Sequence, residues 1–253
     1  MKINRTAQRT MQILSYISEH PSGVDLDHIC EALCLPKTSA YDIVTTLVEC
    51  NMLQIIYGQK NQYTLAIGIY QIGMGYRNNI NYTKAFEEPL RNLAFELHKT
   101  AFFAVANQTD VVYLIKCEPE HPVLTTGKIG GINPMYCTAL GKAILSQMPV
   151  ETQKELISKM HLTRRTSYTL TDPQALLADL EKCRQRGYAV DHRELEDHGL
   201  CVAAPVLDDD NCIVGAISVS DLYRPDEDYH AVGERVKQVA LYLSTLYGHN
   251  GSN

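Results

Sequence analysis

The sequence has no tryptophan, only four phenylalanines among its 253 residues, and no long apolar run. A helix needs roughly 18 consecutive apolar residues to cross a bilayer, so a helical membrane protein is excluded. The first ten residues lack the apolar core of a secretion signal. The eight cysteines are scattered rather than spaced as a framework, which is typical of a reduced protein. We therefore expect a cytoplasmic protein with no membrane partner.

Patterns that carry common enzymatic chemistry are also missing. There is no glycine-rich phosphate loop and no HExxH zinc motif in the chain. Cys30 and Cys34 have helical spacing, but zinc would require two further ligands, so packing explains this pair better. We predict no cofactor, no metal site and no catalytic residue.

The most informative stretch of the chain runs from Val24 to Leu53. Its apolar residues recur at helical spacing in two short segments: Leu26, Ile29, Cys30 and Leu33 in the first, and Ala40, Ile43, Val44, Leu47 and Val48 in the second. A tight break at Cys34-Leu35 separates them, and Pro36 suits the first position of a new helix. Two such helices predict a helix-turn-helix, although a helical hairpin buried in another kind of domain remains an alternative.

The segments on either side extend this motif. Ala7, Met11, Leu14 and Ile17 predict a preceding helix. The stretch QIIYGQKNQYTL that follows Leu53 predicts a hairpin with a polar tip. Three helices and a hairpin within residues 1–65 predict a winged helix-turn-helix domain, which indicates DNA binding.

The second helix would present its polar side to bases in the major groove, while the N-terminal arm and the hairpin tip would reach phosphates. The predicted DNA-binding residues are Arg5, Lys37, Thr38, Ser39, Tyr41, Asp42, Thr45 and Lys60.

The charge of this segment is unusual for a DNA-binding domain. Residues 1–65 carry five basic and six acidic side chains, a net charge of −1, and the whole chain carries −6. The position of positive charge matters more than its sum, so DNA remains a suitable partner. A single copy should nevertheless bind weakly, and we expect paired copies in a homodimer or a dimer of dimers.

The rest of the chain predicts a linker helix and an α+β domain. Residues 66–81 are rich in apolar residues and glycine, and we expect this helix to be buried against a partner subunit or against its own chain. In residues 82–253, strand pairs such as AFFAVAN with VVYLIKC and CVAAPVL with CIVGAISVS alternate with helical segments. One of these helices should span 172–187, with Asp172 as its cap, Pro173 first and Gly187 as its stop. This pattern predicts an antiparallel sheet with helices around it.

Five stretches, in order, carry a family resemblance: LPKTSAYDIVTTL (35–47), PMYCTALGKAIL (134–145), GYAVD (187–191), GLCVAAPV (199–206) and GAISVS (215–220). Behind a winged helix, this set resembles the IclR family of bacterial transcription regulators from end to end. The resemblance implies a winged helix-turn-helix, a linker helix and a GAF-like effector-binding domain. It also implies a dimeric or tetrameric regulator, often a repressor, that responds to a small organic acid. Asp42 departs from the family pattern, where Arg is common.

The effector site can be argued from the residues as well. Ala139 and Leu140 open a predicted helix, whose free N–H groups favour a carboxylate. Ser218 and Ser220 lie two residues apart on a strand and face the same side. By resemblance, the family's pocket for small acids uses the positions that match Ala139, Leu140, Asp191, Cys201, Ser218 and Ser220. Small core residues beneath a sheet would give the same pattern for the serines and the cysteine.

An enzyme is the alternative from another class. Cys201 could act with His198 or His192 as base, but its apolar neighbours predict a raised thiol pKa and thus a poor nucleophile. Asp191, His192, His198 and Cys201 are also suitable types for zinc, which some family members bind. We instead predict a ligand-responsive regulator that binds double-stranded operator DNA and, in its pocket, a hydroxy, keto or sugar acid.

Overall fold

The computed structural model describes residues 3–58, 61–79, 82–123 and 125–247. The contacts between residues divide the chain into two compact units, Met1–Asn81 and Tyr82–Asn253. No helix among the described residues is long and apolar enough to cross a membrane.

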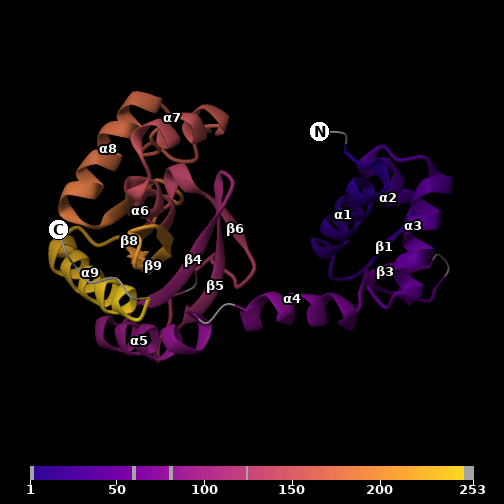
Figure 1. Cartoon of the computed structure of the whole chain (residues 1–253), viewed down its shortest axis with the longest axis horizontal. Helices are drawn as coiled ribbons and strands as arrows, with labels where there is room; N and C mark the ends of the chain where they lie inside the picture. The colour runs from indigo at the N-terminus through magenta and orange to yellow at the C-terminus, as the bar shows by residue number, and fades with distance from the viewer. Residues whose placement is uncertain (1–2, 59–60, 80–81, 124, 248–253) are drawn as a thin grey trace. The chain divides into compact units, whose positions relative to one another are not determined.

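The N-terminal unit is a winged helix-turn-helix followed by a further helix (Figure 1). Its elements are α1 (Arg5–Ser18), β1 (Val24–Asp25), α2 (Leu26–Leu33), α3 (Lys37–Glu49), β2 (Leu53–Ile56), β3 (Gln62–Leu65) and α4 (Ile67–Asn79). The strands form an antiparallel sheet in the order β1-β3-β2, in which β2 and β3 are the predicted hairpin. The fold class predicted for this half is therefore confirmed.

The turn between α2 and α3 is formed by Cys34, Leu35 and Pro36. Cys34 ends α2 in the left-handed conformation, with φ 51°, and Pro36 precedes α3 as its N-cap residue rather than as its first residue. Proline at this position has no N–H to leave unsatisfied, so it prevents α2 from continuing at little cost. The turn is therefore set by local backbone preferences.

The buried face of α1 differs from the predicted one. Ile13 and Ile17 are its buried residues, whereas Met11 is 62% exposed and Ala7 is exposed as well. Ile13 and Ile17 lie four residues apart and pack against the apolar faces of α2 and α3, which rotates Met11 out to solvent. The helix was predicted correctly, together with the buried Ile17 and the partly buried Leu14, whereas Ala7 and Met11 were wrongly predicted to be buried and Ile13 was missed.

The C-terminal unit contains one six-stranded antiparallel sheet in the order β6-β5-β4-β9-β8-β7. Its strands are β4 (Thr100–Asn107), β5 (Asp110–Cys117), β6 (Ile132–Pro134), β7 (Ala189–His192), β8 (Gly199–Leu207) and β9 (Ile213–Leu222). Its helices are α5 (Tyr82–Leu97), the 3-10 turn η1 (Met135–Cys137), α6 (Ala139–Gln147), α7 (Val150–Lys159), α8 (Pro173–Arg186) and α9 (Tyr229–Thr245).

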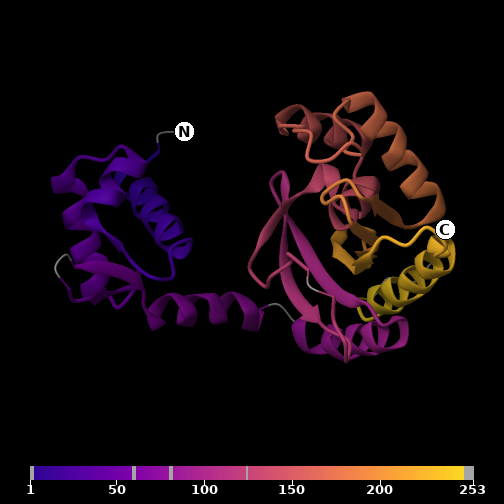
Figure 2. The same cartoon turned by 180° about the vertical axis from the view of Figure 1, so that it is seen from behind.

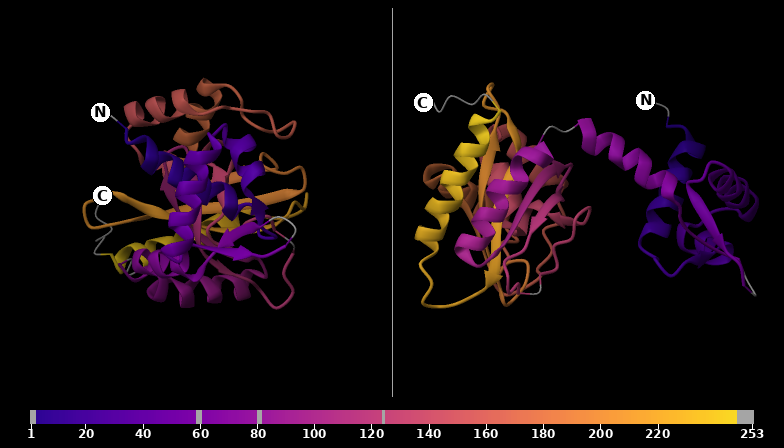
Figure 3. Two further views of the ribbon diagram at one scale, coloured as in Figure 1. Left: turned by 90° about the vertical axis from the view of Figure 1, so that its right-hand side faces the viewer. Right: turned by 90° about the horizontal axis from the view of Figure 1, so that it is seen from below.

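Helices cover both faces of this sheet. Along β4, Ala101 and Phe103 pack with α5 and α9, whereas Phe102 and Ala104 pack with α6 and α8. This alternation follows from the two-residue period of a strand. Figure 2 and Figure 3 show the same two helical layers from behind and at right angles.

Several local predictions in this unit are confirmed. α8 begins after Asp172, whose side chain accepts from the N–H of Ala175, and it ends at Gly187 with φ 82°. The two predicted hairpins are β4–β5 and β8–β9. α7 was not predicted, because its apolar residues are sparse and only Gln153 and Ile157 are buried.

Candidate functional site

The predicted recognition helix exposes the residues that were assigned to DNA. On α3, Lys37, Thr38, Tyr41, Asp42 and Thr45 are exposed, and Ser39 is half-buried. The opposite face is buried in the core of the unit through Ala40, Ile43, Val44 and Leu47. The helix therefore presents one continuous polar face, on which Tyr41 is 55% exposed.

Two of these residues already have partners within the domain. Lys37 Nζ lies 2.6 Å from Asp27 Oδ1 on α2. Arg9 Nη1, on α1, donates to Ser39 Oγ over 3.1 Å. Arg9 was not among the predicted DNA-binding residues. Its hydrogen bond connects α1 to the first turn of α3. Arg5 is the exposed first residue of α1, and Lys60 lies outside the described residues.

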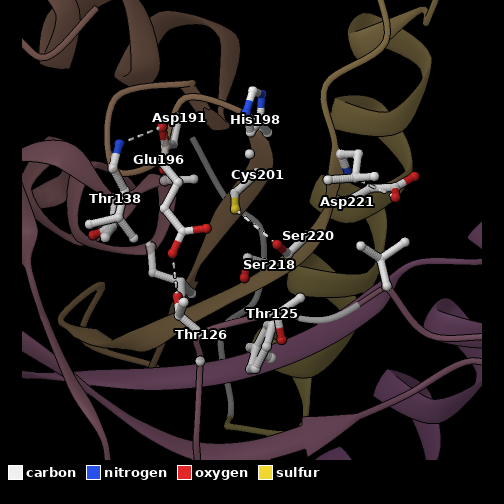
Figure 4. Close-up of a pocket in the computed structure, with 18 of the residues that line it drawn as sticks. Thr125, Thr126, Thr138, Asp191, Glu196, His198, Cys201, Ser218, Ser220 and Asp221 are labelled. Atoms are coloured by element: carbon white, nitrogen blue, oxygen red, sulfur yellow. Dashed lines mark hydrogen bonds between the residues drawn. The ribbon is translucent and has the colours of Figure 1, made fainter. Parts of the chain in front are cut away.

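The six residues predicted for the effector site lie around one cavity in the C-terminal unit. Ala139, Leu140, Asp191, Cys201, Ser218 and Ser220 all line it. The cavity has a volume of ≈ 80 Å³ and lies between the sheet and the loops after β5 and β7. Figure 4 shows Ser218, Ser220 and Cys201 together on the strands at one side of this cavity.

Strand register explains why these residues meet. Asp191 pairs with Cys201 across β7 and β8, and Cys201 pairs with Ser220 across β8 and β9. Cross-strand partners point to the same face, so the three side chains form a row. Cys201 Sγ donates to Ser220 Oγ over 3.2 Å. Ser218, two residues before Ser220, continues the polar strip toward Phe102 on β4.

The first turn of α6 lies at the other side of the cavity. Thr138 caps this helix: its Oγ1 accepts from the N–H of Gly141 over 3.2 Å, and its carbonyl accepts from the N–H of Lys142. Ala139 and Leu140 both line the cavity and belong to the first turn of α6, where N–H groups have no carbonyl partner within the helix. An anion could bind there with help from the helix dipole.

Asp191 is the charged member of the predicted set, and it is 3% exposed. Its Oδ1 accepts from the N–H groups of Glu194, at 2.7 Å, and Leu195, at 3.4 Å. Burial raises the pKa of this carboxyl to about 7, against the lowering effect of Lys142. Asp191 therefore accepts hydrogen bonds only when it is ionised and can donate one when it is protonated, with the change near neutral pH.

The cavity also contains residues that the sequence did not reveal. Thr126 Oγ1 donates to Glu196 Oε1 over 2.7 Å and links the two loops (Figure 4). The further lining residues are Phe102, Tyr113, Val123, Thr125, Thr126, Gly127, Thr138, Leu195, Glu196, His198, Gly199, Asp221 and Leu222. The alternation along β4 and β5 could have indicated Phe102 and Tyr113. The loop residues have no periodic signal.

The geometry disfavours the enzyme and zinc alternatives. Burial raises the pKa of the Cys201 thiol, so little thiolate is present to act as nucleophile or ligand. His192 alternates with Asp191 on β7 and packs instead against Tyr223, with ring centroids 4.9 Å apart. Within the described ranges, no three His, Cys, Asp or Glu side chains are grouped closely enough to hold a metal ion.

Comparison with known proteins gives consistent matches along the chain. The family model described as "Bacterial transcriptional regulator IclR C-terminal" matches residues 74–245, and the IclR helix-turn-helix model matches residues 6–54. The regulator KipR of Bacillus subtilis is 26% identical over 97% of this chain and 98% of its own length. The repressor IclR of Escherichia coli is 28% identical over 95% of this chain and 89% of its own length. The match to KdgR of Dickeya chrysanthemi, at 24% identity, spans 78% of this chain but only 64% of that protein.

Solved structures show the same fold. IclR of Thermotoga maritima, 26% identical, superposes with a TM-score of 0.75 and covers 96% of this chain and 99% of its own. An IclR homologue of Microbacterium hydrocarbonoxydans in complex with 4-hydroxybenzoate, 19% identical, superposes with a TM-score of 0.79 over 95% of this chain and 98% of its own.

Proposed function

Because this chain belongs to the IclR family of bacterial transcriptional regulators, we propose that a small organic acid in its C-terminal domain controls its binding to operator DNA. The N-terminal unit is the helix-turn-helix domain, the C-terminal unit is the effector-binding domain, and the relatives are regulators rather than enzymes. A bacterial transcriptional regulator binds chromosomal DNA, so we infer that this protein is located in the cytoplasm.

One observation carries the proposal for the ligand: the first turn of α6 and a strip of hydroxyl groups line the same cavity. The N–H groups of Ala139 and Leu140 would bind a carboxylate through charge-assisted hydrogen bonds. Ser218 and Ser220 would bind the ligand's hydroxyl or carbonyl oxygens. This arrangement favours hydroxy, keto and sugar acids over hydrocarbons.

The acidic side chains of the cavity narrow the choice further. Asp191 and Glu196 line it, and each disfavours a second carboxylate when it is ionised, whereas the charge of Asp221 is compensated by Lys99. Monocarboxylates should therefore bind better than dicarboxylates. The homologue that binds 4-hydroxybenzoate supports this class, since that ligand has one carboxylate and one hydroxyl.

For DNA, we propose that α3 enters the major groove. Lys37, Thr38, Ser39, Tyr41, Asp42 and Thr45 would contact bases or nearby phosphates, and Arg5 and Lys60 would contact phosphates. Asp42 opposes phosphate contact by its charge, but it can accept from a cytosine amino group.

A ligand screen with one matched variant tests this function. Wild type and Ser218→Ala would be screened by thermal shift against a panel of small carboxylates, and ligands that bind would be measured by calorimetry. Loss of one hydrogen bond should weaken ligand binding by about 1 kcal/mol, roughly fivefold, and leave the DNA affinity of the free protein unchanged. If both proteins bound every ligand equally well, the site would lie elsewhere.

A further inference from the structure

Two buried lysines in the C-terminal unit each lie between two carboxylates. Lys142 on α6 contacts Glu194 and lies 2.9 Å from Asp179 Oδ2. Lys99 lies 2.7 Å from Asp221 Oδ2 and 2.6 Å from Glu227 Oε1. Burial alone lowers the pKa of Lys142, but Glu194 and Asp179 outweigh it and raise that pKa above its ordinary value. Lys142 is therefore a fixed positive charge inside the domain.

Lys142 reaches the ligand cavity through a single residue, Glu194. The side chain of Glu194 contacts the Lys142 ammonium, and its N–H donates to Asp191 Oδ1 over 2.7 Å. The carbonyl of Glu194 accepts from Thr169 Oγ1, also over 2.7 Å. The side chain, the N–H and the carbonyl of Glu194 therefore each have a hydrogen-bond partner. Because the N–H binds Asp191, we infer that the orientation of the Asp191 carboxyl depends on the contact between Lys142 and Glu194.

The charges of this cluster do not balance when every group is ionised. Asp179, Glu194 and Asp191 would contribute three negative charges, against one positive charge from Lys142 and one from Arg186, which lines a second cavity together with Lys142, Asp179 and Glu194. Glu194 is 5% exposed, and its Oε2 has no hydrogen-bond partner among the residues that the structure describes. Buried charge without compensation is costly, so a proton bound to one of these carboxylates is favoured.

Asp191 is the member of the cluster best placed to bind that proton. Lys142 contacts the other two carboxylates directly, whereas it acts on Asp191 only over a longer distance. Burial and the charge of Glu194 both raise the pKa of Asp191. The charged and titratable groups around Asp191 include Lys142, Glu194, Asp179, Glu196, His198, Cys201, Asp221, Tyr113 and Cys137. Beside them lie Arg165, which acts on Cys137, Lys99, which pairs with Asp221, and Arg186 and His192, which line a second cavity with Lys142.

We propose that Lys142 is a positioning residue for the effector site: through Glu194 it sets the orientation and charge of Asp191, which takes up a proton from solvent when an anion binds. The proposal rests on the function proposed above. A carboxylate at the first turn of α6 adds a further negative charge to the same cavity and so favours the neutral form of Asp191. By linkage, protonation of Asp191 must strengthen the binding of that anion to the same extent.

The neutral form of Asp191 also changes which ligands fit. A protonated carboxyl donates one hydrogen bond, so it binds a ligand carbonyl that an ionised carboxylate would repel. Keto acids should therefore bind more tightly as the pH falls through the titration of Asp191. The response of the regulator would depend on pH as well as on ligand concentration.

A titration of Asp191 in the full-length protein, with no ligand, tests the charge cluster. The carboxyl carbons of aspartate would be labelled with ¹³C and followed by NMR, and Asp191→Asn would assign the signal. We expect a midpoint near pH 7, well above the ordinary value of about 4. Lys142→Met should raise this midpoint by removing the positive charge. Asp179→Asn should lower it, because Lys142 then compensates the remaining carboxylates more fully.

Arg235→Met is the control, since Arg235 pairs with Glu96 through two hydrogen bonds of 2.7 Å between α9 and α5, on the face of the sheet away from the cavity. It should remove an ion pair of the same domain and leave the Asp191 midpoint unchanged. Asp179 is 25% exposed at its side chain, so Asp179→Asn tests the cluster even if Lys142→Met fails to fold.

Acetate, the smallest stable carboxylate probe, tests the coupling. Sodium acetate should raise the Asp191 midpoint relative to sodium chloride at equal ionic strength. The proposal is overturned by a midpoint in the ordinary acidic range, by one that the variants do not move, or by one that acetate does not raise. DNA binding and the carboxylate screen are measured separately, so a failure here is distinguishable from a failure of the proposed function.

Discussion

At the scale of single residues, the effector cavity combines groups of very different electrostatic character. Ser218 and Ser220 are neutral at any pH and can donate or accept a hydrogen bond. Asp191, in the same strip of side chains, has a pKa of about 7 because it is buried. The serines therefore define a fixed pattern of hydrogen bonds, and Asp191 adds one that depends on pH.

Asp191→Asn should change how stability depends on pH. The pKa of Asp191 in the folded protein, about 7, exceeds the unfolded value of about 3.9, so folding binds the proton more tightly. The stabilisation by this proton is complete below the unfolded pKa and is lost as the pH rises through the folded pKa. Between about pH 4 and pH 7, the wild type should lose on the order of a few kcal/mol relative to Asp191→Asn.

Urea denaturation of both proteins across this pH range measures the difference. Leu241→Ala is the control, because Leu241 is 47% exposed and carries no titratable group, so its difference from the wild type should be the same at every pH. A constant difference between wild type and Asp191→Asn would show that Asp191 titrates normally.

At the scale of elements, sequence patterns predicted most helices and strands because their signals are local. The cap Asp172, the following Pro173 and the stop at Gly187 define α8 within one segment of the chain. The two-residue period of Ser218 and Ser220 likewise placed both hydroxyls on one face. Ile13 was missed in α1, since two overlapping helical patterns occur there and only packing against α2 and α3 selects one.

The cavity was predicted only in part, for a related reason. Residues on regular elements, such as Asp191 and Cys201, follow from strand register and family resemblance. Thr126 and Glu196 come from loops that are 70 positions apart in the sequence, and nothing local predicts that they meet. The role of Lys142 was hidden for the same reason: a lysine in a predicted helix is usually exposed, and its buried partners lie on other elements.

The contact between α6 and η1 depends on one glycine. A Cβ on Gly141 would lie 2.2 Å from Met135 Cα, so Gly141→Ala should force the first turn of α6 away from η1. We expect a loss of about 1–3 kcal/mol in the free energy of unfolding, together with weaker binding of carboxylates. Lys182→Ala, at an exposed position of α8, is the control. It should stay within about 0.5 kcal/mol of the wild type, and equal losses in both variants would contradict the packing argument.

Tyr41 provides the corresponding test of α3. Its side chain is 55% exposed on the polar face of the helix, where it can contact base edges. Tyr41→Ala should weaken binding to an operator selected from random duplexes by about 1–3 kcal/mol and leave random DNA nearly unaffected. Tyr242→Ala, which removes a tyrosine of equal exposure on α9, should change neither affinity. If Tyr41→Ala left the ratio of the two affinities unchanged, α3 would not be the recognition helix.

At the scale of the whole molecule, charge and exposed apolar surface both favour an oligomer. Residues 1–65 carry a net charge of −1, so a single DNA-binding domain has little electrostatic attraction to DNA. Three large apolar side chains of α4 are each more than 60% exposed: Ile67, Tyr70 and Ile72. A group of exposed apolar side chains on one helix is typical of a protein–protein contact. A second copy of the chain would bury these residues and bring two DNA-binding domains to one operator.

We therefore expect a dimer formed through the N-terminal half, and we expect its loss to weaken DNA binding without altering the fold. Ile72→Asp places a charge in the proposed contact and should shift sedimentation at micromolar concentration toward the monomer. Operator affinity should then fall about a hundredfold or more, because linked domains gain that much from their effective concentration. Val150→Asp, on an exposed position of α7, should affect neither property. A wild-type monomer that still bound operator tightly would contradict the argument, since one domain with a charge of −1 would then suffice.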